Sequence, residues 1–229
     1  MQPDNVDAQR ELFMCDFDNK PHECLKALEE LIQKEAKNLE QDGCFEDVGE
    51  FWSIFETRPF MRAHACYLYA LIDLGLMHRA IDEAKEMLRL CEADNLGVRY
   101  HLMHLYVYIE DELHAVALHK QYDEVDETQM LLPLTILYYK LGDEKKAEEY
   151  LHRLAAKNKD TKEFLTNLAN HREEVMTEML EGHTAYGYAP FTYSEFMAEL
   201  SKCRFLFFAV PAFPKWALKH LPKRSRKKT

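Results

Sequence analysis

Residues 134–154 read LTILYYKLGDEKKAEEYLHRL and carry the strongest structural signal in the chain. Apolar side chains recur at helical intervals on both sides of Gly142. Ala147 follows that glycine by five residues. Glycine ends helices readily because it adopts a left-handed backbone, and a small alanine lets two helices approach closely. The stretch therefore predicts an antiparallel helical hairpin that turns at Gly142.

The same pattern occurs earlier in the chain. Residues 58–74 and 77–91 form a second predicted pair of helices, with Gly75 at the turn and Ala80 five residues after it. A shift of 37 residues superposes this pair on a third, matching Arg62 with Arg99, Leu68 with Leu105, Tyr69 with Tyr106, and Ala80 with Ala117. Such hairpins cannot bury their apolar faces alone, so repeated units must stack. We therefore expect three consecutive hairpins.

These hairpins predict an all-α protein with the architecture of a right-handed α-solenoid. We expect roughly nine to eleven helices. Outside the hairpins, the apolar periodicity predicts helices over residues 21–41, 47–55, 161–180 and 194–208. The resulting division is 1–57 for N-terminal helices, 58–157 for the three hairpins, 158–221 for C-terminal helices continuing the array, and 222–229 for a basic flexible tail.

The composition agrees with a helical, folded protein. Of the 229 residues, 47% are hydrophobic and 30% are charged, which supports a core and argues against disorder. The seven glycines and eight prolines are few for this length, as expected for long helices joined by short turns. The formal charge of −11 disfavours nucleic acid, except for weak contact through the basic tail.

The chain shows no sequence signal for secretion or membrane insertion. Its first thirty residues lack a basic segment followed by an apolar one, and the longest apolar stretch, residues 205–213, is too short to span a bilayer. The six cysteines are scattered without a CxxC pair, a pattern that favours free thiols in a reducing compartment. We therefore expect a cytoplasmic protein with no membrane association.

Residues 58–157 resemble the tetratricopeptide-repeat superfamily in the spacing of their hairpins. The chain departs from the usual pattern in carrying Glu112 where the second hairpin would have glycine. The runs FWSIFETRPFMRA at 51–63 and DNLGVRY at 94–100 also resemble a bacterial repeat-protein family with an ETRPFMRA-type motif and, more distantly, the suppressor-of-tumorigenicity-7 family. These resemblances imply a helical repeat fold and no particular reaction.

A recurring set of polar and aromatic residues marks a candidate binding groove. It consists of Arg62, Tyr69 and Asp73 in one hairpin and of Arg99, Tyr106 and Glu110 in the next. The resemblance implies that the first helix of each hairpin lines a concave surface. Arginine binds carboxylates through two hydrogen bonds, and tyrosine offers apolar area with a polar tip. The set therefore predicts an adaptor or scaffold that binds a protein or peptide carrying acidic groups.

A structural interpretation of the same arginines stays open. Arg62 and Arg99 could form ion pairs with Asp73, Glu110 or Glu56 and only fix the stacking of the hairpins, because repeats keep framework contacts as readily as binding ones. The sequence does not decide between ligand binding and stacking. It also gives no oligomeric state.

Catalytic and metal-binding motifs do not emerge from the sequence. It contains no GxSxG, P-loop, GxGxxG or HExxH. His101 with His104, and His114 with His119, lack a third ligand at a recognisable spacing. We therefore predict no catalytic residue, no metal and no cofactor. Two rival hypotheses are a metal-dependent enzyme or regulator assembled from scattered histidines and carboxylates, and a nucleic-acid-associated factor that uses the basic tail.

Overall fold

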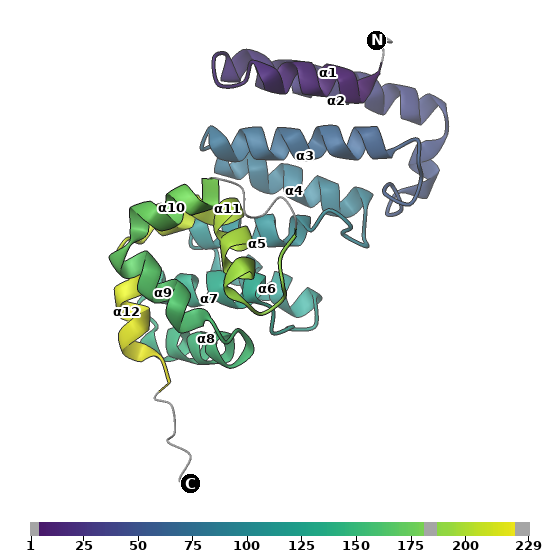
Figure 1. Cartoon of the computed structure of the whole chain (residues 1–229). Coiled ribbons are helices and arrows are strands. Elements are labelled where there is room, and N and C mark those ends of the chain that lie inside the picture. The colour runs from purple at the N-terminus through teal and green to yellow at the C-terminus, as the bar shows by residue number, and fades with distance from the viewer. Residues whose placement is uncertain (1–4, 181–186, 223–229) are drawn as a thin grey trace. The chain divides into compact units, whose positions relative to one another are not determined.

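A computed structural model of the chain describes residues 5–180 and 187–222. These residues form twelve α-helices and one short 3-10 helix (Figure 1). In the described ranges the only β-type pairing is an isolated bridge between Cys91 and the Gly49–Glu50 backbone. The all-α prediction is confirmed. The solenoid arrangement stays a prediction. The predicted tail, apart from Pro222, lies outside the described residues.

The chain divides into two compact units, Met1–Leu105 and Tyr106–Thr229. The boundary falls inside one helix, α5, and within the segment predicted as three hairpins. The first unit contains α1 (Val6–Cys15), α2 (Pro21–Gln41), η1 (Cys44–Asp47), α3 (Arg58–Asp73), α4 (Met77–Leu90) and most of α5 (Val98–Tyr108). The second contains α6 (Glu112–Gln121), α7 (Thr128–Leu141), α8 (Glu144–Lys157), α9 (Thr161–Asn170), α10 (Arg172–Leu180), α11 (Tyr193–Ala209) and α12 (Phe213–His220).

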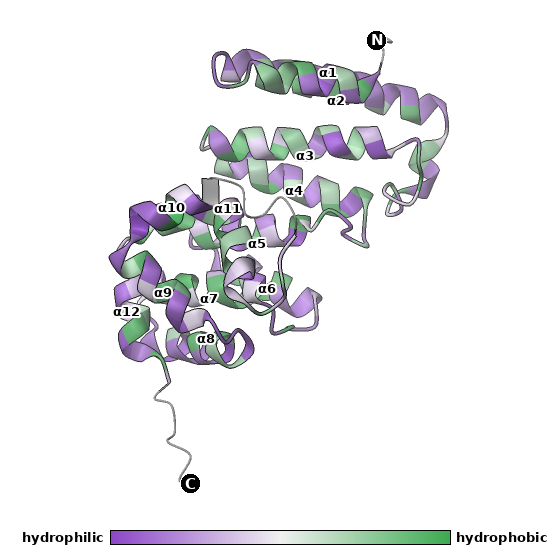
Figure 2. Cartoon of the chain, in the orientation of Figure 1, coloured by the Kyte–Doolittle hydropathy of each residue, from purple (hydrophilic) through white to green (hydrophobic). Residues whose placement is uncertain are grey.

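In the first unit, α2 packs on α3, α3 packs on α4, and α1 contacts both α2 and α3 (Figure 1). Hydrophobic and hydrophilic residues are interleaved along α2 and α3 (Figure 2). The helical period turns the apolar ones inward, so Leu28, Leu31 and Leu68 are almost fully buried. Burial of each such side chain contributes about 1.5–3 kcal/mol.

The helix predicted over residues 47–55 does not form. Gly49 has a φ of 107°, a left-handed value that interrupts a helix. The amides of Gly49 and Phe51 both donate to the carbonyl of Leu90, at 3.1 and 3.0 Å. The segment therefore satisfies its backbone against the end of α4, while the ring of Phe51 is fully buried.

In the second unit, α7 and α8 form an antiparallel hairpin, and α9 packs against α8, α11 and α12. The single helix predicted over 161–180 is in fact two helices, α9 and α10, because His171 leaves the helical conformation with a φ of −134°. The helix predicted over 194–208 is confirmed as α11, although it bends at Cys203.

The three hairpin turns share one backbone design. A left-handed residue ends the first helix, and the next amide donates back to a carbonyl five residues earlier, as in a Schellman motif. The left-handed residues are Gly75, Glu110 and Gly142, with φ values of 71°, 58° and 73°. The closing bonds run from Leu76 to Leu71 at 2.8 Å, from Asp111 to Tyr106 at 2.9 Å, and from Asp143 to Tyr138 at 3.0 Å.

Each hairpin turn is followed, at a fixed distance in sequence, by a buried alanine. Ala80, Ala115 and Ala147 each follow the left-handed residue by five positions, and all three are fully buried. The predicted packing of Ala117 is wrong, because this residue is exposed. The second hairpin turns at Glu110, two residues before Glu112, so the register of its second helix moves by the same amount.

Candidate functional site

Arg62, the first residue of the predicted groove, joins α3 to α1. Its Nε and Nη2 atoms donate to the Oδ1 and Oδ2 atoms of Asp7 at 2.9 and 2.6 Å. The hydrogen bonds from Arg62 lower the pKa of the Asp7 carboxyl, and the positive charges of Arg62 and Arg10 add to this effect. Arg62 thus makes a two-point ion pair between α3 and α1. Its partner, Asp7, is not one of the acidic residues that the sequence pattern suggested.

Tyr69 and Asp73 lie farther along α3 and are both exposed. The Tyr69 side chain is 43% exposed, and its ring meets the ring of His101 edge to face at a centroid distance of 5.1 Å. Together with Arg62, these two residues keep the shared helical face expected from their spacing.

Arg99 is held at the start of α5 by a fully buried Asp94 side chain. The Asp94 carboxylate accepts the amides of Val98 and Arg99 at 2.6 and 3.2 Å, and the Arg99 guanidinium donates to it at 3.0 Å. Burial raises the pKa of the Asp94 carboxyl, and these hydrogen bonds oppose that rise. Arg99 also donates to the hydroxyl of Tyr100 at 2.5 Å. Its guanidinium therefore makes contacts at the start of α5, where Asp94 caps the helix.

Tyr106 and Glu110, which belong to the second unit, also make framework contacts. Tyr106 is only 4% exposed and stacks on His114 at a centroid distance of 5.4 Å. Glu110 forms the hairpin turn and pairs with Lys140 at 2.5 Å. Four of the six predicted groove residues therefore lie in the first unit and two in the second. Their role in binding a ligand stays a prediction.

The histidine pairs named from the sequence lie in different surroundings. The rings of His101 and His104 are both buried, with centroids 6.2 Å apart. His114 meets Asp111 at 2.7 Å, whereas His119 contacts the carbonyl of Val125 at 3.2 Å. Burial lowers the pKa of His119, which keeps its imidazole neutral. His114 and His119 are thus engaged separately.

A buried polar cluster ties four segments of the second unit together around Glu195. One carboxylate oxygen, Oε2, accepts the hydroxyl of Thr128 at 2.6 Å, the amide of Phe191 at 2.9 Å and the side-chain amide of Asn158 at 3.2 Å. Asn158 also donates to the carbonyl of Thr192 at 3.1 Å. These bonds join the start of α7, the end of α8 and the segment before α11, so the cluster is structural.

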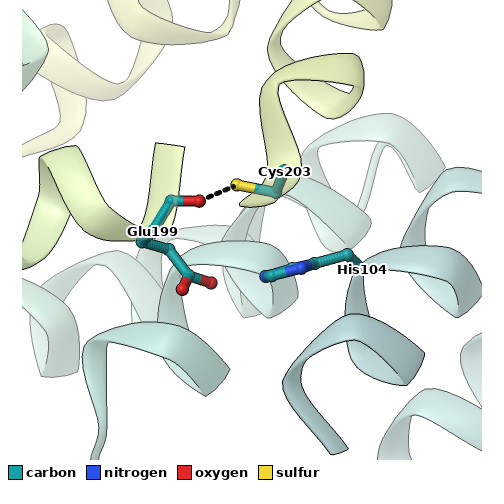
Figure 3. A group of neighbouring side chains, drawn as sticks. All are labelled: His104, Glu199 and Cys203. Carbon is teal, nitrogen blue, oxygen red and sulfur yellow. Dashed lines mark hydrogen bonds between the residues drawn. The ribbon is translucent and has the colours of Figure 1, made fainter. Parts of the chain in front are cut away.

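Glu199 lies one helical turn after Glu195 on α11, and Cys203 lies one turn after Glu199. Both side chains are buried. The Cys203 thiol donates to the backbone carbonyl of Glu199 at 3.1 Å (Figure 3). Burial raises the pKa of this thiol well above its usual range, and the Glu199 carboxylate raises it further. This environment disfavours the thiolate, which is the reactive form of a cysteine. Figure 3 also labels His104, a residue of the first unit.

An open pocket of about 420 Å³ lies among α8, α9 and α12 in the second unit. Its apolar lining comes from Ala155, Leu218, Leu221 and Pro222, and its polar lining from Lys159, Thr161 and Lys162. The hydroxyl of Thr161 donates to the carbonyl of Asn158 at 2.7 Å and is buried. The pocket thus presents an apolar floor and two exposed ammonium groups to a ligand.

The two pocket lysines are not neutralised within the described part of the chain. Neither ammonium group makes an ion pair or a hydrogen bond with another described residue. Sequence periodicity did not predict this site, because residues 155–162 and 218–222 come together only through the packing of α12 on α8 and α9. The one available signal was the pair of lysines flanking the start of a predicted helix.

Comparisons with known proteins give no match to a protein-family model, to a curated protein or to a solved structure. Across the described residues, no helix combines the length and the apolar character needed to cross a membrane.

Proposed function

We propose that this chain is a protein-binding scaffold and that a segment of its partner occupies the α8–α9–α12 pocket. The observation that carries the proposal is the pocket itself, which combines apolar side chains with unpaired charges on an open surface. Sites that bind a ligand side chain are concave and mostly apolar, with a few polar groups that fix orientation.

The surrounding structure supports binding at a preformed surface. The start of α9 is anchored to the rest of the unit, because Asp160 accepts the amide of Tyr193 at 3.0 Å and Asn158 is fixed by Glu195. On the other side, Phe213 and Ala217 of α12 are fully buried. Both α9 and α12 are thus anchored in the second unit, and a preformed site reduces the entropy lost on binding.

Selection from a displayed library of random peptides tests this function. Enriched peptides should bind the wild-type protein and lose affinity for Leu218→Ser, which removes part of the apolar floor. The matched control is Leu113→Ser in α6, where the leucine is 76% exposed and outside the pocket. Failure to enrich any peptide, or equal binding to both variants, would contradict the proposal.

A further inference from the structure

We infer that the partner segment in this pocket is acidic, with one apolar side chain inserted between carboxylates that pair with Lys159 and Lys162. This inference rests on the proposed function and specifies the chemistry of the ligand. It follows from the charge, the lining and the shape of the pocket.

The charge of the pocket is positive although the chain is acidic. Among the described residues, its lining includes two lysines and no acidic side chain. Neither pocket lysine has an ion pair with a described residue, whereas Lys140 and Lys146 of the same unit pair with Glu110 and Glu112 at 2.5 and 2.9 Å. Two unpaired ammonium groups beside an apolar surface attract carboxylates, and they repel a basic segment.

The acidic residues next to the lysines in sequence, Asp160 and Glu163, form no ion pair with Lys159 or Lys162. The Asp160 carboxylate instead accepts the amide of Tyr193. Within the described part of the chain, the two ammonium groups are therefore left for an external carboxylate.

The apolar lining favours a peptide over a nucleic acid or free phosphate. Leu218, Leu221 and Pro222 provide aliphatic surface that suits a leucine or similar side chain. Single-stranded nucleic acids use aromatic rings as stacking platforms, and the described residues of this lining include none. The same described residues include no arginine, the side chain best suited to binding phosphate at two points.

An extended peptide places residues two positions apart on the same side, because a strand advances about 3.3 Å per residue and alternates its side chains. Acidic residues two positions from an apolar anchor therefore face the same surface as the anchor, where the long, flexible stems of Lys159 and Lys162 can meet them. One apolar residue would supply burial, while the flanking carboxylates would fix orientation and select the sequence.

Fluorescence anisotropy with three labelled synthetic peptides tests the inference on the full chain. One peptide has a central leucine flanked by glutamates, the second replaces the leucine with serine, and the third replaces the glutamates with lysines. The proteins are wild type, the double variant Lys159→Glu with Lys162→Glu, and Lys145→Glu with Lys85→Glu. Neither lysine of this last pair lines the pocket, and the pair matches the change in net charge.

The wild-type protein should bind the glutamate–leucine peptide at least about tenfold more tightly than either other peptide. Charge reversal in the pocket should remove this preference and strengthen binding of the lysine–leucine peptide. The Lys145 and Lys85 pair of changes should preserve the wild-type order. Circular dichroism should show equal helicity in all three proteins.

Different results distinguish failure of the acidic-partner inference from failure of the proposed binding function. Equal binding of acidic and basic leucine peptides, with loss of both on Leu218→Ser, would overturn the acidic partner and keep the binding function. A preference for glutamates that survives reversal of Lys159 and Lys162 would also overturn this inference. If neither these peptides nor any library peptide binds the pocket, the proposed function fails with it.

Discussion

At the level of single residues, Glu195 holds several segments of the second unit together. It is 4% exposed and its Oε2 atom accepts hydrogen bonds from three separate segments. Removing such an acceptor leaves its donors without a partner in a low-dielectric interior, which costs far more than the net value of one exposed hydrogen bond.

We therefore expect Glu195→Ala to lower the free energy of unfolding by roughly 3 kcal/mol or more. Glu195→Gln should cost less, because its amide oxygen can still accept hydrogen bonds. The measurement is urea unfolding followed by circular dichroism, with the exposed Glu163→Ala as control. A loss below about 1 kcal/mol for Glu195→Ala would show that the cluster is not a stabilising junction.

The Asp7–Arg62 pair should give a pH-dependent contribution to stability. Because the pKa of the Asp7 carboxyl is lowered in the folded protein, the ionised carboxylate stabilises the fold above the ordinary pKa of an aspartate. This contribution should disappear as the pH falls through the lowered pKa. The difference in unfolding free energy between wild type and Asp7→Asn should therefore shrink in acid. If the difference in unfolding free energy between wild type and Asp7→Asn grew in acid, the assigned direction of the Asp7 pKa shift would be wrong.

Among the helices and turns, the second hairpin shows most clearly what a sequence pattern can and cannot predict. Periodicity placed α3, α4 and α8 closely, because each combines a strong apolar face with a glycine or a proline near one end. It missed the start of α7, which begins at Thr128 and continues through Pro133, whereas the predicted hairpin starts at residue 134. It misplaced the second turn, since Glu110 occupies a left-handed conformation that glycine usually marks. The pocket was missed because its lining has no periodic relation in sequence.

Replacing Glu110 with glycine should stabilise the second hairpin. A non-glycine residue in this conformation carries a strain of about 1 kcal/mol, and the pair with Lys140 recovers little because the Glu110 side chain is 51% exposed. Glu110→Gln removes the charge but keeps the strain, so it should be neutral or slightly destabilising. Differential scanning calorimetry should then rank Gly above wild type, and wild type at or above Gln. A lower melting temperature for Glu110→Gly would disprove the strain.

The shifted register also distinguishes two alanines in α6. Ala115 is fully buried and Ala117 is exposed, so only Ala115→Leu should overpack the hairpin. We expect a loss of about 1–3 kcal/mol for Ala115→Leu and almost none for Ala117→Leu. Thermal unfolding of both variants makes the comparison. A larger loss at Ala117 would restore the register derived from the sequence repeat.

Across the full chain, the formal charge of −11 sets the approach of any charged partner. Long-range potential depends on this net charge, whereas binding in the proposed pocket depends on two nearby lysines. For an acidic peptide, the net charge of the chain causes repulsion at long range, whereas the two lysines cause attraction at short range. The two effects also respond differently to salt, because the Debye length shrinks from about 30 Å at 0.01 M to about 8 Å at 0.15 M.

The association rate of the glutamate–leucine peptide should consequently rise as salt increases over this range. Salt screens the repulsion between two acidic molecules before they touch, while the lysines act only at short distance and chiefly slow dissociation. Stopped-flow anisotropy separates the two rates, and the lysine–leucine peptide should show the opposite salt dependence of association. If the acidic peptide instead associates more slowly at higher salt, the pocket lysines govern its approach despite the net charge.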